Sequence, residues 1–188
     1  KQYLSDYSHE EKLTLIARDI YTVTPDEIGT FDIIMLRDVI EHIPNQERFM
    51  HYLKDFMHGE SIVFFGFPVC CNPFGGHQQI CRNKLLAHMP WLHLFPIALY
   101  KKVLHWGKEK SGTIKGLLEI KATGISLHRF EKILSKEQYQ VLCHTHYLIN
   151  PNYEIKFGLR PRIVPKLLQI PYLQDFYTTA MYYVVKKH

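Results

Sequence analysis

The apolar positions in the first third of the chain fall into short runs separated by turn residues. Residues 13–19 (LTLIARD), 31–36 (FDIIML) and 61–67 (SIVFFGF) are runs that predict strands. After Asn45 the apolar residues recur at helical spacing, and Gly59 is expected to end that helix. Strand, helix and strand at short intervals are typical of a parallel βαβ unit. The near-continuous apolarity of 31–36 predicts a strand covered on both faces.

The central third has a different pattern. Residues 80–106 are rich in aromatic side chains and predict helices that break at the two prolines of this stretch. Residues 107–124 are more polar and are expected to be irregular in part. We interpret residues 68–124 as an inserted lid or substrate region within one domain that spans residues 1–188.

The last third predicts one helix and two long strands. Residues 127–134 have the spacing of a short helix, with Phe130 facing inward, whereas 139–150 and 176–187 are rich in Tyr, Val and Thr and predict antiparallel strands. A long connection with one helical run at 164–169 is expected between them. The chain is therefore predicted to be α/β, with a mixed sheet of parallel strands plus a C-terminal antiparallel pair.

Composition narrows the class of protein. The chain has 188 residues, of which 46% are hydrophobic and 22% charged, an ordinary balance for a globular domain. Its net charge of +5 is too moderate and diffuse to favour a nucleic-acid partner. No apolar run is long enough to span a bilayer, and residues 1–12 lack the features of a signal peptide. We therefore expect a cytoplasmic protein.

Three motifs carry a resemblance to a known family. They are 17–20 (ARDI), 29–32 (GTFD) and 36–43 (LRDVIEHI), in the order of a strand that ends in an acid, a short loop, and a strand that begins with Phe-Asp and runs into a polar turn. In this order and spacing the chain resembles the class I S-adenosylmethionine (SAM)-dependent methyltransferases. The resemblance implies a Rossmann-like sheet, SAM as cofactor, and methyl transfer to a small-molecule acceptor, with O-methylation expected.

The same resemblance implies a set of cofactor-binding residues. Asp19 would accept a hydrogen bond from the adenine amino group, and Ile20 would pack on the ring. The end of the next strand would face the methionyl part of the cofactor and the substrate, through Leu36, Arg37 and Asp38. Two alternatives stay open, namely that Asp19 caps a turn and that Arg37 is a surface residue.

The motifs begin part-way through the family's pattern. The glycine-rich loop that cradles the methionine moiety and the acid that holds the ribose are both absent, because no GxGxG occurs in these residues. We therefore expect a truncated form without the N-terminal strands, with weak or no SAM binding and no turnover. A homodimer that covers the exposed sheet edge, and a non-catalytic binding module on the same fold, are the alternatives.

Two histidines are candidate catalytic bases. His77 follows the third predicted strand, and a histidine with a pKa near neutrality can deprotonate a hydroxyl that attacks the sulfonium methyl group. The preceding Gly75 and Gly76 would let the backbone approach a ligand closely. His42 is the competing base, and a loop position without chemistry is the alternative for His77.

A metal site is the minority hypothesis for the same region. Asp38, Glu41 and His42 are spaced so that they share a helix face, and His77 could add a ligand. A similar cluster binds a divalent metal in small-RNA 2'-O-methyltransferases, so Mg, Mn or Zn and an RNA substrate form the third functional hypothesis. The preferred interpretation has no metal, with Glu41 and His42 ordering the turn through hydrogen bonds.

The acceptor is expected to bind in the insertion. Five side chains could line an apolar pocket there: Trp91, His93, Phe95, Tyr100 and Trp106. The alternative is that these residues pack the insertion on the domain. The lysines within residues 101–110 also suit an anionic acceptor or a peripheral membrane contact.

Overall fold

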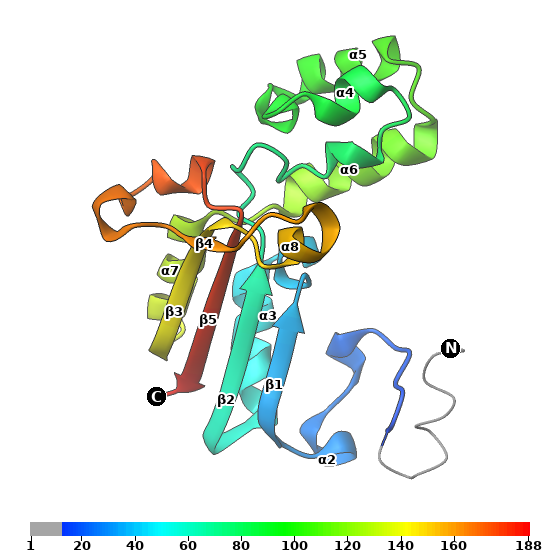
Figure 1. The fold of residues 1–188 in the computed structure, drawn as a ribbon. Coiled ribbons are helices and arrows are strands. Elements are labelled where there is room, and N and C mark those ends of the chain that lie inside the picture. The colour runs from blue at the N-terminus through cyan, green and yellow to red at the C-terminus, as the bar shows by residue number, and fades with distance from the viewer. Residues whose placement is uncertain (1–12) are drawn as a thin grey trace.

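A computed structural model describes residues 13–188, which form an α/β fold around one mixed sheet. The sheet has five strands in the spatial order β1-β2-β5-β3-β4 (Figure 1). In chain order the strands are β1 (Phe31–Arg37), β2 (Met57–Phe67), β3 (Tyr139–Ile149), β4 (Arg162–Ile163) and β5 (Ala180–Lys187). β1 pairs parallel with β2, and all other pairings are antiparallel. The predicted parallel pairing of the strands at 31–36 and 61–67 and the predicted C-terminal antiparallel pair are therefore confirmed.

Helix α3 (Gln46–Leu53) connects the two parallel strands. Asn45 precedes it in a left-handed conformation, and its side chain accepts a hydrogen bond from the backbone N–H of Arg48 at 3.2 Å, as an N-cap does. The prediction that Gly59 ends this helix is wrong. Buried Phe56 and Met57 turn the chain into the core, so β2 begins at Met57 and Gly59 lies within the strand.

The main core lies between the sheet and two helices on one of its faces, α3 and α7 (Leu127–Lys136). At its centre the ring of Phe130 meets three aromatic rings of the sheet, with centroid distances of 5.2 Å to Phe65, 4.8 Å to Phe67 and 5.2 Å to Tyr183. All four side chains are fully buried, and each contributes on the order of 1.5–3 kcal/mol. The predicted inward face of α7 is confirmed.

Two predictions near the start of the chain are wrong. Residues 13–19 form no strand; they are largely exposed and pair with no strand within residues 13–188. β1 is consequently an edge strand, and its Ile33 and Met35 are 62% and 69% exposed instead of covered. The apolar run at 13–19 lacks a partner strand, and the outer face of β1 lacks a covering helix in the described part of the chain.

The insertion is a helical unit that stands beyond the carboxyl ends of β1 and β2 (Figure 1). It contains α4 (Lys84–His88), α5 (Ile97–Trp106) and α6 (Ser111–Thr123), with breaks at the predicted prolines. Residues 107–110 are irregular, as predicted for part of 107–124, but residues 111–123 of that segment form α6, which buries Ile114 and Leu117 in the core of the insertion. Their spacing of three residues places them on one helix face.

The connection between β3 and β5 contains a helix that the sequence did not predict, α8 (Asn152–Phe157). The helical run predicted at 164–169 is reduced to a single 3-10 turn, and the last strand begins at Ala180 instead of residue 176. Shorter elements are α2 (Pro25–Ile28) and the 3-10 turns η2 (Ile20–Thr22), η3 (Ile40–His42), η4 (Lys54–Phe56), η5 (Gln78–Ile80), η6 (Leu92–Leu94), η7 (Lys166–Leu168) and η8 (Gln174–Phe176). None of the helices within residues 13–188 combines the length and apolar character that crossing a bilayer requires.

Candidate functional site

The insertion leaves the sheet at the carboxyl ends of the two parallel strands, and α8 lies across these strand ends (Figure 1). Residues of all three parts line two cavities there, which together we call the crevice. Asp38 follows β1 with a φ of 54°, and its backbone N–H donates to the carbonyl of Gly66 in β2 at 2.7 Å. Beside it is a cavity of about 330 Å³, which we call the polar cavity. Its polar lining includes Asp38, Glu41, Asn72, His77, Asn152 and Lys156.

Glu41 is the most unusual group in this lining. It lies in η3 and is 4% exposed, and neither carboxylate oxygen has a hydrogen-bond partner among the described residues. Nε2 of His42 is 3.8 Å from Oε1 of Glu41, which is too far for a hydrogen bond. Burial, and to a lesser extent the charge of Asp38, raise the pKa of Glu41 to about 7, although its own backbone N–H opposes the shift. The carboxyl group is therefore poised to exchange a proton near neutral pH.

The interpretation of Glu41 as a turn-ordering residue stays a prediction. Its own backbone N–H lies close enough to the carboxylate to lower the pKa, but neither oxygen makes a hydrogen bond of normal geometry with residues 13–188. A buried carboxyl without a partner costs the fold free energy, so packing alone does not explain its presence.

His77 lines the polar cavity from the residue that precedes η5. Its backbone is left-handed, with a φ of 55°, and its ring meets the ring of His42 edge to face at a centroid distance of 5.4 Å. Burial lowers the pKa of His77, the nearby His42 lowers it further, and Asp38 opposes both effects. His77 is therefore neutral at pH 7 and can accept a proton. His42 contacts His77 but does not itself line the cavity.

The two glycines before His77 serve packing. A Cβ on Gly75 would lie 2.5 Å from the carbonyl oxygen of Cys70, and a Cβ on Gly76 would lie 2.2 Å from Cβ of His93. The close approach that these glycines permit is thus to the protein's own chain, which corrects the expectation of a close approach to a ligand.

The proposed metal ligands are not gathered into a metal centre. Within the part of the chain that the structure describes, no group of three or more His, Cys, Asp and Glu side chains is arranged to hold a metal ion. Asp38, Glu41 and His77 line one cavity, and His42 reaches it only through the ring of His77.

The predicted cofactor residues have different surroundings. Asp19 caps η2, where its Oδ1 accepts a hydrogen bond from the backbone N–H of Tyr21 at 3.0 Å, and neither Asp19 nor Ile20 lines the polar cavity. Leu36 packs against the main core. Arg37 donates a hydrogen bond to Asn152 Oδ1 at 2.5 Å and so ties α8 to the end of β1. Of the five predicted residues, only Asp38 lines the polar cavity.

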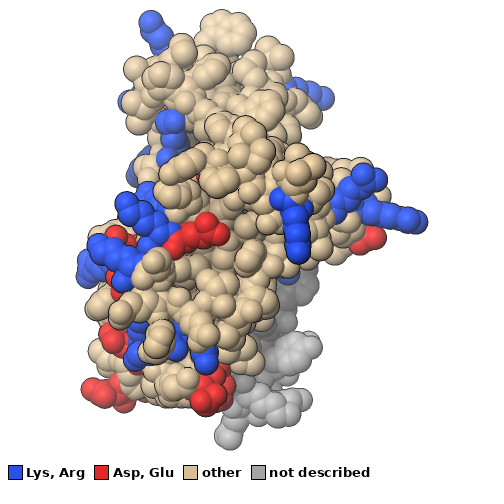
Figure 2. All heavy atoms as spheres, turned by 90° about the vertical axis from the view of Figure 1, so that its left-hand side faces the viewer, with Lys and Arg blue, Asp and Glu red and all other residues tan. Residues whose placement is uncertain are grey.

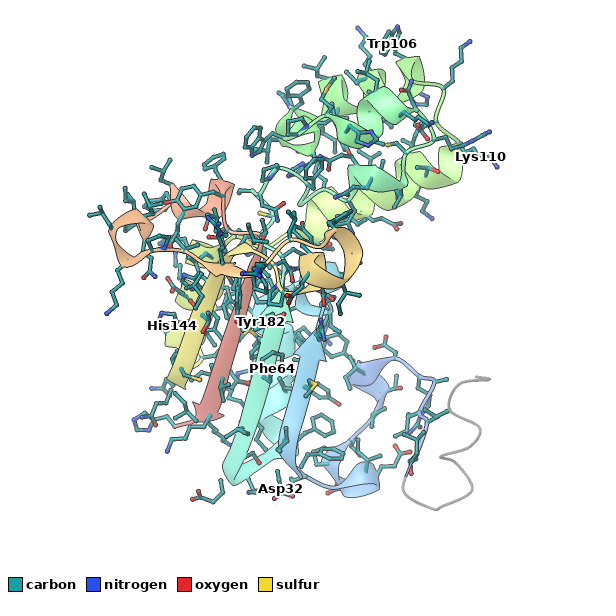
Figure 3. All side chains as sticks on the ribbon, viewed as in Figure 1. Asp32, Phe64, Trp106, Lys110, His144 and Tyr182 are labelled. Carbon is teal, nitrogen blue, oxygen red and sulfur yellow. The ribbon has the colours of Figure 1, made fainter. Side chains whose placement is uncertain are left out.

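The predicted acceptor residues pack the insertion or lie on its surface. Tyr100 is fully buried in the core of the insertion, and His93 is buried with its Nε2 2.6 Å from the carbonyl oxygen of Cys70. Trp106 is 70% exposed and lies at the far end of the insertion (Figure 3). Trp91 and Phe95 are partly exposed, and none of these five residues lines the crevice. The prediction of an acceptor pocket built from these residues is therefore wrong for this conformation.

A second cavity, of about 680 Å³, continues from the polar cavity between the insertion and α8. We call it the apolar cavity, because most of its wall is formed by Phe74, Ile80, Ala87, Tyr153, Phe157 and Leu159. Five residues line both cavities: Phe74, His77, Gln79, Tyr153 and Lys156. Sequence reasoning missed the contribution of α8, whose only signal was the aromatic pair Tyr153 and Phe157 at helical spacing.

The outer surface of the insertion is basic. Lys101, Lys102, Lys108 and Lys110 are all exposed. Figure 2 shows basic side chains on an otherwise uncharged surface at the upper end of the molecule, whereas the acidic side chains gather lower down. The contact with a membrane surface stays a prediction.

Comparison with known proteins assigns this chain to no family. No protein-family model matches the chain, and no curated protein matches its sequence.

Proposed function

We propose that this fold serves SAM-dependent transfer of a methyl group to an oxygen of a small molecule. The observation that carries the proposal is the crevice at the carboxyl ends of β1 and β2, which has two proton acceptors, Glu41 and His77, in its wall. In open α/β sheets, ligands bind outside the carboxyl ends of the parallel strands. The order of the three sequence motifs supports the same proposal by resemblance.

Asp38 fits one part of the cofactor. Its carboxylate is exposed, lines the polar cavity, and lies directly after β1, where the ammonium of a methionyl group would find a counter-charge. The resemblance assigns the adenine to Asp19 and Ile20, but both lie outside the polar cavity, and the carboxylate of Asp19 caps η2 instead. When bound, SAM would supply a methyl group that its positively charged sulfur activates. The methyl carbon would be the electrophile.

The protein's own residues then hold the acceptor and remove its proton. His77 is neutral at pH 7 because burial lowers its pKa, so it can take the proton of an acceptor hydroxyl as the oxygen attacks. Glu41, with a pKa of about 7, is a second proton acceptor in the same wall. The rest of the rate enhancement comes from positioning of the two reactants.

Calorimetric titration of SAM into the full-length gene product tests the proposal. We expect saturable heat, and Asp38→Asn should weaken binding about fivefold through loss of one exposed ion pair. Asp32→Asn is the matched control, because Asp32 lies at the opposite end of the same strand (Figure 3). An absence of heat at high protein concentration would refute the methyltransferase proposal and leave a non-catalytic binding module.

The RNA alternative receives less support. It depends on a metal centre, and the residues required for it are not gathered as ligands in the described chain. An affinity for RNA that falls steeply with salt concentration would favour it nonetheless, because phosphate contacts release counterions.

A further inference from the structure

The apolar cavity has one Lys, Arg, Asp or Glu residue in its lining, Lys156 in α8. Of the described residues that line this cavity, none is acidic, and Lys156 forms no ion pair with another residue of 13–188. Lys156 is also one of the residues that line both cavities. A ligand that fills this space therefore meets apolar walls and a single positive charge.

The walls favour an aromatic body. The rings of Tyr153 and Phe157 meet edge to face at a centroid distance of 5.4 Å, and Phe74 and Ile80 contribute apolar surface from the insertion side. Phe157 is 65% exposed and Ile80 is 56% exposed, so both present apolar surface that a bound ring would cover. A volume of about 680 Å³ lies within the range of small-molecule sites.

A polar contact is available on the insertion side. Nδ1 of His88 is 2.7 Å from the carbonyl oxygen of Lys84, and because a carbonyl only accepts, Nδ1 carries the proton. Nε2 of the neutral ring is then an acceptor in a residue that lines the cavity. A hydroxyl or amide group on the ligand can donate to it.

We propose that the acceptor is an aromatic hydroxy compound with an anionic group, bound in the apolar cavity with the anion at Lys156 and the hydroxyl at His77. The role of this compound as a methyl acceptor rests on the proposed function. Its binding in the apolar cavity does not depend on methyl transfer. The continuity of the two cavities at His77 places the hydroxyl beside the proton acceptors of the polar cavity.

Equilibrium titration with two fluorescent probes, without SAM, tests the site. The probes are a hydroxynaphthoate and the matching neutral hydroxynaphthamide, which differ only in charge. We expect the acid to bind about fivefold more tightly, as one exposed ion pair allows. Lys156→Gln should remove this preference and leave amide binding unchanged. Lys166→Gln, an exposed lysine in η7 outside the cavity, is the charge-matched control.

A second pair of variants tests the apolar wall on the same helix. Phe157→Ala should weaken binding of both probes about tenfold, because one ring face is lost. Ile155→Ala is the control, because Ile155 is 89% exposed and lies outside the cavity. Equal affinity for the two probes, or equal loss in both alanine variants, would overturn the assignment. Probe binding without SAM binding would sink the proposed function and leave this site standing.

Discussion

Replacement of Glu41 by Gln removes the buried carboxyl group of the polar cavity and keeps the size of the side chain. The side chain is buried, and its oxygens have no hydrogen-bond partner among the described residues. The neutral amide cannot ionise. The variant is therefore spared the destabilisation that the wild-type protein suffers when the buried carboxyl of Glu41 becomes charged. The quantity of interest is the difference in unfolding free energy between the two proteins as a function of pH.

The sign follows from the two pKa values of the carboxyl group. It ionises near 4.5 in the unfolded chain and at about 7 in the folded protein. Between these values the unfolded state has released the proton and the folded state has not, so the wild-type protein loses stability as pH rises from about 4.5 to about 7. Above about pH 7 the loss is complete, and at about 1.4 kcal/mol per pH unit it totals about 3 kcal/mol.

Urea unfolding at intervals between pH 4.5 and pH 8.5 measures this difference. We expect Glu41→Gln to gain about 3 kcal/mol relative to the wild-type protein across this range, with most of the change below pH 7. Glu60→Gln is the control, since Glu60 is an exposed residue of β2, and its difference from the wild type should stay flat. A flat difference for Glu41→Gln as well would refute the raised pKa and with it the role of Glu41 as a proton acceptor.

Two further predictions concern the insertion and the loop that carries His77. Gly76→Ala should lower the unfolding free energy by about 2 kcal/mol in chemical denaturation, because the added Cβ would overlap His93. Gly116→Ala should instead raise it by about 0.5–1 kcal/mol, because the added Cβ in α6 meets open space and Ala favours the helix. Glu109→Ala should cost about 2–3 kcal/mol, since its buried carboxylate accepts from the backbone N–H groups of Arg82 at 3.1 Å and Asn83 at 2.8 Å. Hydrogen exchange should then show lower protection of the α4 amides, and unchanged protection would contradict this role.

The sequence predicted best where a local signal and a tertiary contact agree. Asn45 predicts the start of α3, because its side chain is a typical helix cap. The helical spacing of Phe130 and Ile133 predicts the buried face of α7. The strands at 139–150 and 176–187 were recognised from their β-branched and aromatic residues, although β5 begins later than predicted. In each case the deciding information lies within one turn or one strand of the chain.

The sequence predicted worst where burial depends on distant residues. The run at 13–19 has the composition of a buried strand, but its environment in the described chain offers no partner for it. α6 was missed because only Ile114 and Leu117 are buried, against residues of α4 and α5. The sequence predicts only a long connection around Tyr153 and Phe157. Their position against the insertion, where they line the apolar cavity, depends on the tertiary fold.

The polar cavity contains three features that cost the fold free energy, although left-handed residues and buried polar groups without a partner also occur elsewhere in the described chain. Asp38 and His77 are non-glycine residues with left-handed backbones, each of which costs on the order of 1 kcal/mol, and both line the polar cavity. Their conformations are held by backbone hydrogen bonds, from Asp38 to Gly66 at 2.7 Å and from His77 to Phe74 at 3.0 Å. Glu41 adds a buried carboxyl without a partner in the same wall. A ligand that donates a hydrogen bond to the Glu41 carboxyl would satisfy a group that the described chain leaves without a partner, and it would do so within a cavity that also has Asp38 and His77 in its wall.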